Sequence, residues 1–139
     1  IFLRKGYDEK WGGGKIEDTS PTPELLNPTI IYAPLVASLL KDFPILGMAN
    51  ITGGGIPENL PRCFPKGLRP EVDYDSWPMP KLFSKIMLAG EIPPEEMKNV
   101  FNLGIGYCLV VPEEVATDVQ LRIEGHGLKS WDIGIAVSI

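Results

Sequence analysis

Three consecutive glycines follow an apolar run near the middle of this chain. Ile45 to Thr52 predicts a buried strand, residues 52–55 (TGGG) come next, and Pro57 then suits the first position of a helix. Glycine lets backbone N–H groups approach a ligand without a Cβ in the way, and the unpaired N–H groups at a helix start favour an anion. This order of elements predicts either a cradle for a phosphate group or a tight turn that needs positive φ.

Two polar side chains follow in the short helix predicted near residues 57–64. Asn59 could bind a ligand or cap the local backbone. Arg62 could add positive charge to the same anion or be an ordinary solvated arginine. The phosphate-binding candidates from this segment are Thr52, Gly53, Gly54, Gly55, Asn59 and Arg62.

A second glycine motif, FNLGIG at residues 101–106, leads into an apolar run. Ile105 to Val111 predicts a central strand. Two glycines at the start of a strand indicate close approach by a ligand or a neighbouring segment. Alternatively, Asn102 or Gly104 ends the preceding helix, and spacing alone favours this second interpretation.

The rest of the chain alternates between the two kinds of apolar spacing. Helices are expected over residues 34–43, 57–64, 80–90, 94–101 and 113–124, and strands over residues 30–32, 45–52, 71–74, 105–111 and 131–137. This order predicts an α/β (α+β) fold with a mixed sheet covered by helices. Residues 1–27 are rich in glycine and proline and predict an irregular tail or interdomain linker, which leaves residues 28–139 as the folded domain.

Composition excludes several classes of protein. A net charge of −5 argues against nucleic acid as a partner, and no apolar stretch approaches the ~20 residues of a membrane span. Cys63 and Cys108 predict buried free thiols in a reducing compartment, with the cytoplasm as the default. The one histidine, His126, is expected to be exposed after a helix, and we find neither a metal-ligand set nor a catalytic triad. Because the chain opens on Ile1, we expect it to begin inside a longer polypeptide.

Several motifs in order resemble the C-terminal domain of the phosphoribosylformylglycinamidine cyclo-ligase family, also called aminoimidazole ribonucleotide synthetases. The resemblance covers residues 25–135. Its motifs are LNPTIIY at 26–32, ITGGG at 51–55 with Glu58-Asn59 and Pro61-Arg62, Phe101-Asn102 with Gly104 and Gly106, and WDIG at 131–134.

The resemblance implies a ligase of purine biosynthesis. The family uses ATP to close the imidazole ring of formylglycinamidine ribonucleotide, giving aminoimidazole ribonucleotide, ADP and phosphate. It implies that an N-terminal domain holds ATP and Mg²⁺ and most of a homodimer interface, so this fragment alone is expected to be inactive. The C-terminal domain is expected to close over a cleft, with the TGGG loop facing the substrate phosphate and with Asn59, Arg62, Asn102 and Gly104 lining the cleft.

Two positions depart from the family pattern. Asn50 stands where the family usually has histidine, and it can form hydrogen bonds but cannot transfer a proton near neutral pH. We therefore take Asn50 as the candidate at the catalytic position. Ile30 replaces a usual arginine and removes a positive charge near the cleft. Together these departures leave open a paralogue with altered or weakened activity. Two further alternatives are another ATP-dependent synthetase of the same superfamily and a non-catalytic phosphate-binding or scaffold domain.

Overall fold

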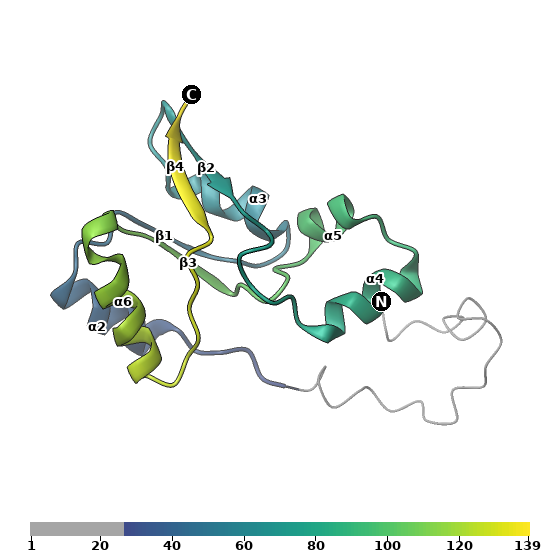
Figure 1. The fold of residues 1–139 in the computed structure, drawn as a ribbon, viewed down its shortest axis with the longest axis horizontal. Helices are drawn as coiled ribbons and strands as arrows, with labels where there is room; N and C mark the ends of the chain where they lie inside the picture. The colour runs from purple at the N-terminus through teal and green to yellow at the C-terminus, as the bar shows by residue number, and fades with distance from the viewer. Residues whose placement is uncertain (1–26) are drawn as a thin grey trace.

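The computed structural model describes residues 27–139, shown in Figure 1. The helices are α2 (Ala33–Asp42), α3 (Gly55–Asn59), the 3₁₀ helix η2 (Leu60–Cys63), α4 (Lys81–Gly90), α5 (Pro94–Val100) and α6 (Glu113–Gly125). The strands are β1 (Gly47–Asn50), β2 (Leu68–Val72), β3 (Tyr107–Val110) and β4 (Gly134–Ser138). The predicted tail lies outside the described residues, apart from Asn27.

The strands form two antiparallel pairs, β1 with β3 and β2 with β4. Helices and strands are mixed along the chain, which confirms the predicted α/β (α+β) class. Within residues 27–139 the strands make two small sheets rather than one mixed sheet. The order of helices and strands in the sequence indicates the class, but it does not specify which strands pair.

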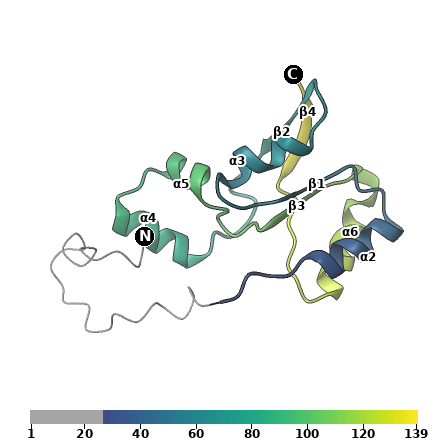
Figure 2. The ribbon, with the colours of Figure 1, turned by 180° about the vertical axis from the view of Figure 1, so that it is seen from behind.

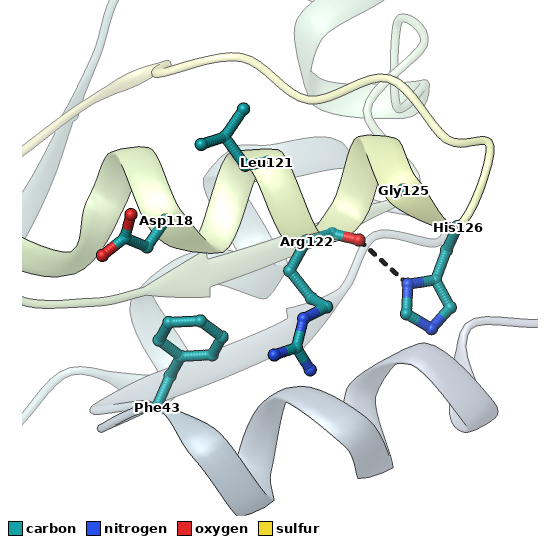
Figure 3. A pocket seen from close by; sticks show the side chains of 6 residues that line it. All are labelled: Phe43, Asp118, Leu121, Arg122, Gly125 and His126. Carbon is teal, nitrogen blue, oxygen red and sulfur yellow. Dashed lines mark hydrogen bonds between the residues drawn. The ribbon is translucent and has the colours of Figure 1, made fainter.

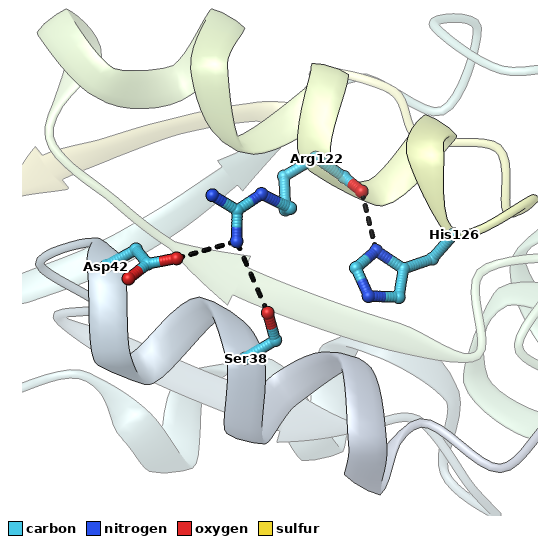
Figure 4. Close-up of polar contacts among 4 residues, drawn as sticks. All are labelled: Ser38, Asp42, Arg122 and His126. Atoms are coloured by element: carbon cyan, nitrogen blue, oxygen red, sulfur yellow. Dashed lines mark hydrogen bonds and ion pairs between the residues drawn. The ribbon is translucent and has the colours of Figure 1, made fainter.

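Helices α2 and α6 cover one side of the β1–β3 pair. Leu35 and Leu39 of α2 and Val119 of α6 are buried together, and Leu109 of β3 packs against them. Arg122 of α6 ties the two helices at their outer surface, with its guanidinium 2.6 Å from the carboxylate of Asp42 and 3.3 Å from the hydroxyl of Ser38 (Figure 4).

A second buried cluster joins β1, α3 and β3 to the segment that follows β2. It consists of Ile51, Ile56, Leu60, Trp77, Ile105 and Cys108. A third cluster lies under α4 and α5, where Ile86 and Met97 pack with Leu103. Figures 1 and 2 show α2 and α6 at one end of the molecule, α4 and α5 at the other end, and the β2–β4 ribbon projecting between them. None of the described helices is long and apolar enough to span a membrane.

The strand predicted over residues 30–32 is wrong, because this segment is irregular and Ile31 is 81% exposed. Pro28 and Pro34 lie on either side of it and carry no N–H group, which disfavours pairing in a sheet. The strand predicted over 45–52 forms only as β1, and its residues alternate between half-buried and exposed rather than being buried throughout.

The other predicted elements form with shifted ends. The strand expected over 71–74 occupies 68–72, the one over 105–111 shortens to 107–110, and the one over 131–137 becomes 134–138. The helix over 80–90 forms as α4, but the left-handed residue that ends it is Glu91, with φ 49°, and not Gly90. In the described residues β3 pairs only with β1, so the prediction of a central strand is not met.

Candidate functional site

Pairing of β1 with β3 brings the two glycine motifs together. Asn50, the last residue of β1, lies opposite Tyr107, the first residue of β3. Just beyond the strands, the Ile51 N–H donates to the Gly106 carbonyl at 2.9 Å. The TGGG loop therefore leaves the sheet at the point where the FNLGIG motif joins it. Two segments about fifty residues apart in the sequence form one surface.

The TGGG loop itself is a tight turn that starts α3. Gly54 has φ 91° and precedes the helix, and Gly55, its first residue, has φ 59°. These left-handed conformations explain glycine at both positions. Gly53 differs, because its φ is not positive and a Cβ built on it would meet no atom within 4 Å. The turn gives no reason for glycine at this position.

Gly55 also packs against the end of α5. A Cβ on Gly55 would overlap with the carbonyl oxygen of Lys98 and lie 2.8 Å from that of Phe101. Only a residue without a side chain permits this approach. The contact joins the start of α3 to the residue that begins the FNLGIG motif, so both motifs are held in place by backbone packing.

Asn59 holds the loop from inside. Its side chain is buried, with 6% of the residue exposed, and its amide nitrogen donates to the carbonyls of Gly53 at 3.2 Å and Gly55 at 2.7 Å. Of the two roles that the sequence left open, the structure favours capping of the local backbone. Arg62 lies exposed in η2, one short helix further along the chain.

The FNLGIG motif forms a turn made by its own residues and covered by neighbours. The Asn102 side-chain oxygen accepts from the Gly104 N–H at 3.0 Å, and Leu103 and Gly104 have φ of 50° and 104°. Trp77 is buried and donates its indole N–H to the Leu103 carbonyl at 3.0 Å. A Cβ on Gly104 would lie 2.7 Å from the Cδ of Pro80. Close approach here is therefore made by a neighbouring segment of the same chain.

Gly106 makes room for a tyrosine. A Cβ on Gly106 would overlap with the phenol oxygen of Tyr32, whose ring lies 5.2 Å from the ring of Tyr107. Burial raises the pKa of Tyr32, and the nearby Cys108 raises it further. Sequence reasoning gave Tyr32 no role, although it ends the LNPTIIY motif. Tyr32 thus packs on Tyr107, the residue that is paired with Asn50 across the two strands.

The exposed side of the site carries donors and one negative charge. Asn50, Thr52 and Gly53 are exposed, and the N–H groups of Gly53 and Gly54 donate to no acceptor within residues 27–139. The carboxylate of Glu58 lies directly against Gly54, where a Cβ would otherwise be. Sequence reasoning did not identify Glu58 as a charge at the loop, although a residue four positions after Gly54 returns to the same side of a helix.

One hollow of the described surface lies away from the two glycine motifs. It has a volume of about 520 Å³, lies between α2 and α6, and is shallow and open (Figure 3). Arg122 and the exposed His126 line it, and the His126 Nδ1 lies 2.9 Å from the Arg122 carbonyl oxygen. None of the predicted site residues lines this hollow, so it does not belong to the two glycine motifs.

A smaller hollow of about 370 Å³ lies next to the FNLGIG motif. Trp77 and Met97 line it together with Leu103 of the motif and Lys98 of α5. Across residues 27–139, no three or more His, Cys, Asp or Glu side chains gather where they could hold a metal ion.

Comparison with known proteins identifies the family. The family model described as "AIR synthase related protein, C-terminal domain" matches residues 6–138. The chain belongs to this family. The match confirms the resemblance predicted from the ordered motifs between residues 26 and 134.

Curated relatives named phosphoribosylformylglycinamidine cyclo-ligase are identical to the chain at about half of the aligned positions. The chain is 50% identical over 119 residues to the phosphoribosylformylglycinamidine cyclo-ligase of Prochlorococcus marinus (strain MIT 9313). This alignment covers 84% of the chain and 34% of that protein. The chain is also 50% identical over 111 residues to the cyclo-ligase of Bacillus subtilis (strain 168), covering 80% of the chain and 32% of that protein. The chain thus spans about a third of the length of the curated relatives it matches.

Proposed function

We propose that this chain is the C-terminal, substrate-binding domain of a phosphoribosylformylglycinamidine cyclo-ligase. The enzyme would close the imidazole ring of formylglycinamidine ribonucleotide with ATP, yielding aminoimidazole ribonucleotide, ADP and phosphate. The observation that carries the proposal is the meeting of the TGGG and FNLGIG motifs at the ends of β1 and β3. The 50% sequence identity to proteins with this name, over alignments that include both motifs, supports the proposal.

In this proposal the TGGG loop binds the substrate's phosphate. The Gly53 and Gly54 N–H groups, which have no acceptor in the described structure, and the exposed Thr52 hydroxyl would donate to phosphate oxygens. Arg62 would add positive charge. Asn59 would act on the loop and not on the ligand, because both of its amide hydrogen bonds go to loop carbonyls.

The remaining site residues would position the reacting end of the substrate. Asn50 and Asn102 flank the junction of the two motifs and can donate and accept hydrogen bonds. ATP supplies a phosphoryl group that turns the formyl-amide oxygen of the substrate into a good leaving group. The amidine nitrogen then attacks the activated carbon, and inorganic phosphate leaves with that oxygen. Holding the phosphate end and the amide end together is the part of catalysis assigned to this domain.

The other components of the reaction are assigned to the longer protein. We propose that ATP and Mg²⁺ are bound mainly by an N-terminal domain, since this chain spans only about a third of the length of the curated relatives, and that the full-length protein forms a homodimer. The cytoplasm is the proposed location, in keeping with the unpaired thiols of Cys63 and Cys108.

The test is an amide NMR titration of the 139-residue chain with formylglycinamidine ribonucleotide. Saturable shifts confined to residues 50–62 and 102–106 are expected. A Gly53→Val variant should lose these shifts with its fold intact, because a branched side chain would shield the neighbouring N–H groups. Gly125→Val is the matched control, since a Cβ on Gly125 also meets no atom within 4 Å but lies at the end of α6.

Two results would overturn the phosphate-loop assignment: no shifts at millimolar ligand, or shifts that Gly53→Val leaves unchanged. Turnover of formylglycinamidine ribonucleotide by the full-length protein tests the reaction separately. A protein that binds this ribonucleotide but does not convert it in the presence of ATP and Mg²⁺ would instead be a non-catalytic phosphate-binding domain or a different synthetase.

A further inference from the structure

The turn between α5 and β3 has a backbone conformation that its own residues do not favour. The Ile105 N–H donates to the Asn102 carbonyl at 2.9 Å, so Leu103 and Gly104 are the two central residues of this turn. Both have positive φ, which is the combination found in type I′ turns. Such turns prefer asparagine, aspartate or glycine at the first central position, where this chain has leucine. Contacts with other segments therefore hold the turn in this conformation.

These contacts come mainly from the segment between β2 and α4. The Trp77 indole N–H donates to the Leu103 carbonyl at 3.0 Å, and both residues are buried. Pro80 covers Gly104 so closely that a Cβ on the glycine would lie 2.7 Å from the proline Cδ. The Leu103 side chain is enclosed by the cluster under α4 and α5. The indole bond is the contact that fixes the direction of the Leu103 carbonyl, because a hydrogen bond is directional and apolar packing is not.

Trp77 is itself held in place by the residues before it. The Ser76 N–H and hydroxyl both donate to the Asp73 carbonyl, at 3.3 Å and 2.8 Å, and form a turn directly after β2. The Tyr74 ring lies 5.4 Å from the Trp77 ring. A buried indole N–H needs an acceptor, and here the acceptor belongs to the FNLGIG motif. The structure after β2 therefore fixes the indole, and the indole fixes the turn.

One peptide group connects Trp77 to Asn102. The carbonyl that accepts from the indole and the Gly104 N–H belong to the same planar peptide unit. That N–H donates at 3.0 Å to the side-chain oxygen of Asn102, one of the predicted cleft residues. The indole on one side of the peptide therefore sets the orientation of the carboxamide on the other side. Because the carboxamide oxygen is engaged, Asn102 directs its NH₂ group, a donor, outward.

We propose that Trp77 is a positioning residue of the substrate site, acting through the Leu103–Gly104 peptide to aim the Asn102 NH₂ group at an oxygen acceptor of the bound ribonucleotide. This rests on the proposed function, in which Asn102 helps to position the reacting end of the substrate. Hydrogen bonds in a chain polarise one another, so binding at Asn102 also strengthens the bond from the indole. Trp77 acts on the substrate without touching it.

The first test is the amide NMR titration of the 139-residue chain with formylglycinamidine ribonucleotide, followed at the indole N–H groups. The Trp77 indole N–H should shift with the same dissociation constant as the Asn102 NH₂ group, although Trp77 is buried. Trp131 is the matched control, because it packs against the same cluster and its indole forms no hydrogen bond with any residue from 27 to 139. Its N–H should stay in place. A Trp77 indole N–H that does not move while Asn102 saturates would overturn the proposal.

The second test is a double-mutant cycle. Trp77→Phe keeps an aromatic ring but loses the donor, and it should weaken binding at least about fivefold. Trp131→Phe should bind like the unchanged chain. Asn102→Asp keeps an oxygen for the Gly104 N–H but has no donor for the ligand. In that background Trp77→Phe should have little further effect, because the group that the indole positions is already absent. A merely structural role would weaken binding by the same factor in both backgrounds.

The outcomes separate this inference from the proposed function. Equal losses from Trp77→Phe in both backgrounds, in chains with native circular dichroism spectra, would overturn the positioning role and leave the proposed function standing. No binding by the unchanged chain would overturn the proposed function, and this inference with it. If Trp77→Phe does not fold, the titration of the unchanged chain decides alone, since it needs no variant.

Discussion

Replacing Gly55 with alanine tests whether backbone packing holds the two glycine motifs together. The added Cβ would overlap with the Lys98 carbonyl oxygen and approach that of Phe101 to 2.8 Å. These atoms belong to the end of α5 and not to a flexible side chain. Either α3 or α5 must shift to accept the methyl group, so we expect the variant to be less stable and its two motifs to separate.

The size of the effect follows from two costs. A left-handed conformation at φ 59° costs a residue with a Cβ about 1–2 kcal/mol. Forcing a methyl group into a packed interior typically costs about 1–3 kcal/mol. The sum, about 2–5 kcal/mol, is a large fraction of the roughly 5–15 kcal/mol that stabilises a domain. With a urea m-value of about 1–2 kcal/mol/M, the unfolding midpoint should fall by at least about 1 M.

Gly53→Ala is the matched control in the same loop. Gly53 has no positive φ, and a Cβ there meets nothing within 4 Å, so alanine should be neutral or stabilising by about 0.4–1 kcal/mol. Both variants are measured by urea unfolding followed by circular dichroism. If Gly55→Ala unfolds at the same urea concentration as Gly53→Ala, the packing of Gly55 against α5 is not what holds the loop.

Three further predictions concern single side chains. Asn59→Ala should lower the free energy of unfolding in urea by about 1–3 kcal/mol, because the carbonyls of Gly53 and Gly55 lose their donor. The exposed Asn99→Ala is the control, and a smaller effect at Asn59 than at Asn99 would contradict the role given to Asn59. Glu58→Gln should tighten binding of inorganic phosphate in an NMR titration, since it removes a negative charge from the surface of Gly54, and unchanged affinity would remove Glu58 from the site. Burial raises the pKa of the Cys108 thiol to about 12. Between about pH 9 and about pH 12 the thiol ionises in the unfolded chain but stays neutral in the folded protein. The free energy of unfolding is therefore unaffected below about pH 9 and falls as pH rises over that interval. A Cys108→Ala variant should therefore lose less stability over that interval, as urea midpoints at several pH values would show.

The sequence was informative where local chemistry decides structure. Proline and apolar spacing located α2, α4, α5 and α6, and the glycine run located the turn before α3. These features act within one turn of the chain, so they can be read from neighbouring residues. The same rules misjudged residues 30–32, because an apolar, β-branched segment forms a strand only where a partner offers hydrogen bonds.

Contacts between distant residues account for what sequence reasoning missed. The partner of Gly106 is Tyr32, more than seventy positions earlier, and the atoms that meet Gly55 are carbonyls of α5. Asn59 illustrates the same limit for a polar residue, since its burial and its two carbonyl partners decide between cap and ligand. Nothing in the spacing of these residues specifies which segments approach one another.

The structure gives a reason for glycine at every glycine position of the two motifs except Gly53. Gly54 and Gly55 are explained by positive φ, Gly55 further by α5, and Gly106 by the phenol of Tyr32. For these positions a substitution that abolishes binding would also disturb the fold, so loss of binding would say little about a ligand. Gly53 has neither a positive φ nor a close neighbour, and it is exposed beside N–H groups without an acceptor. The fold therefore does not require glycine at this position, and substitution of Gly53 tests the proposed access of a phosphate group to the backbone without disturbing the fold.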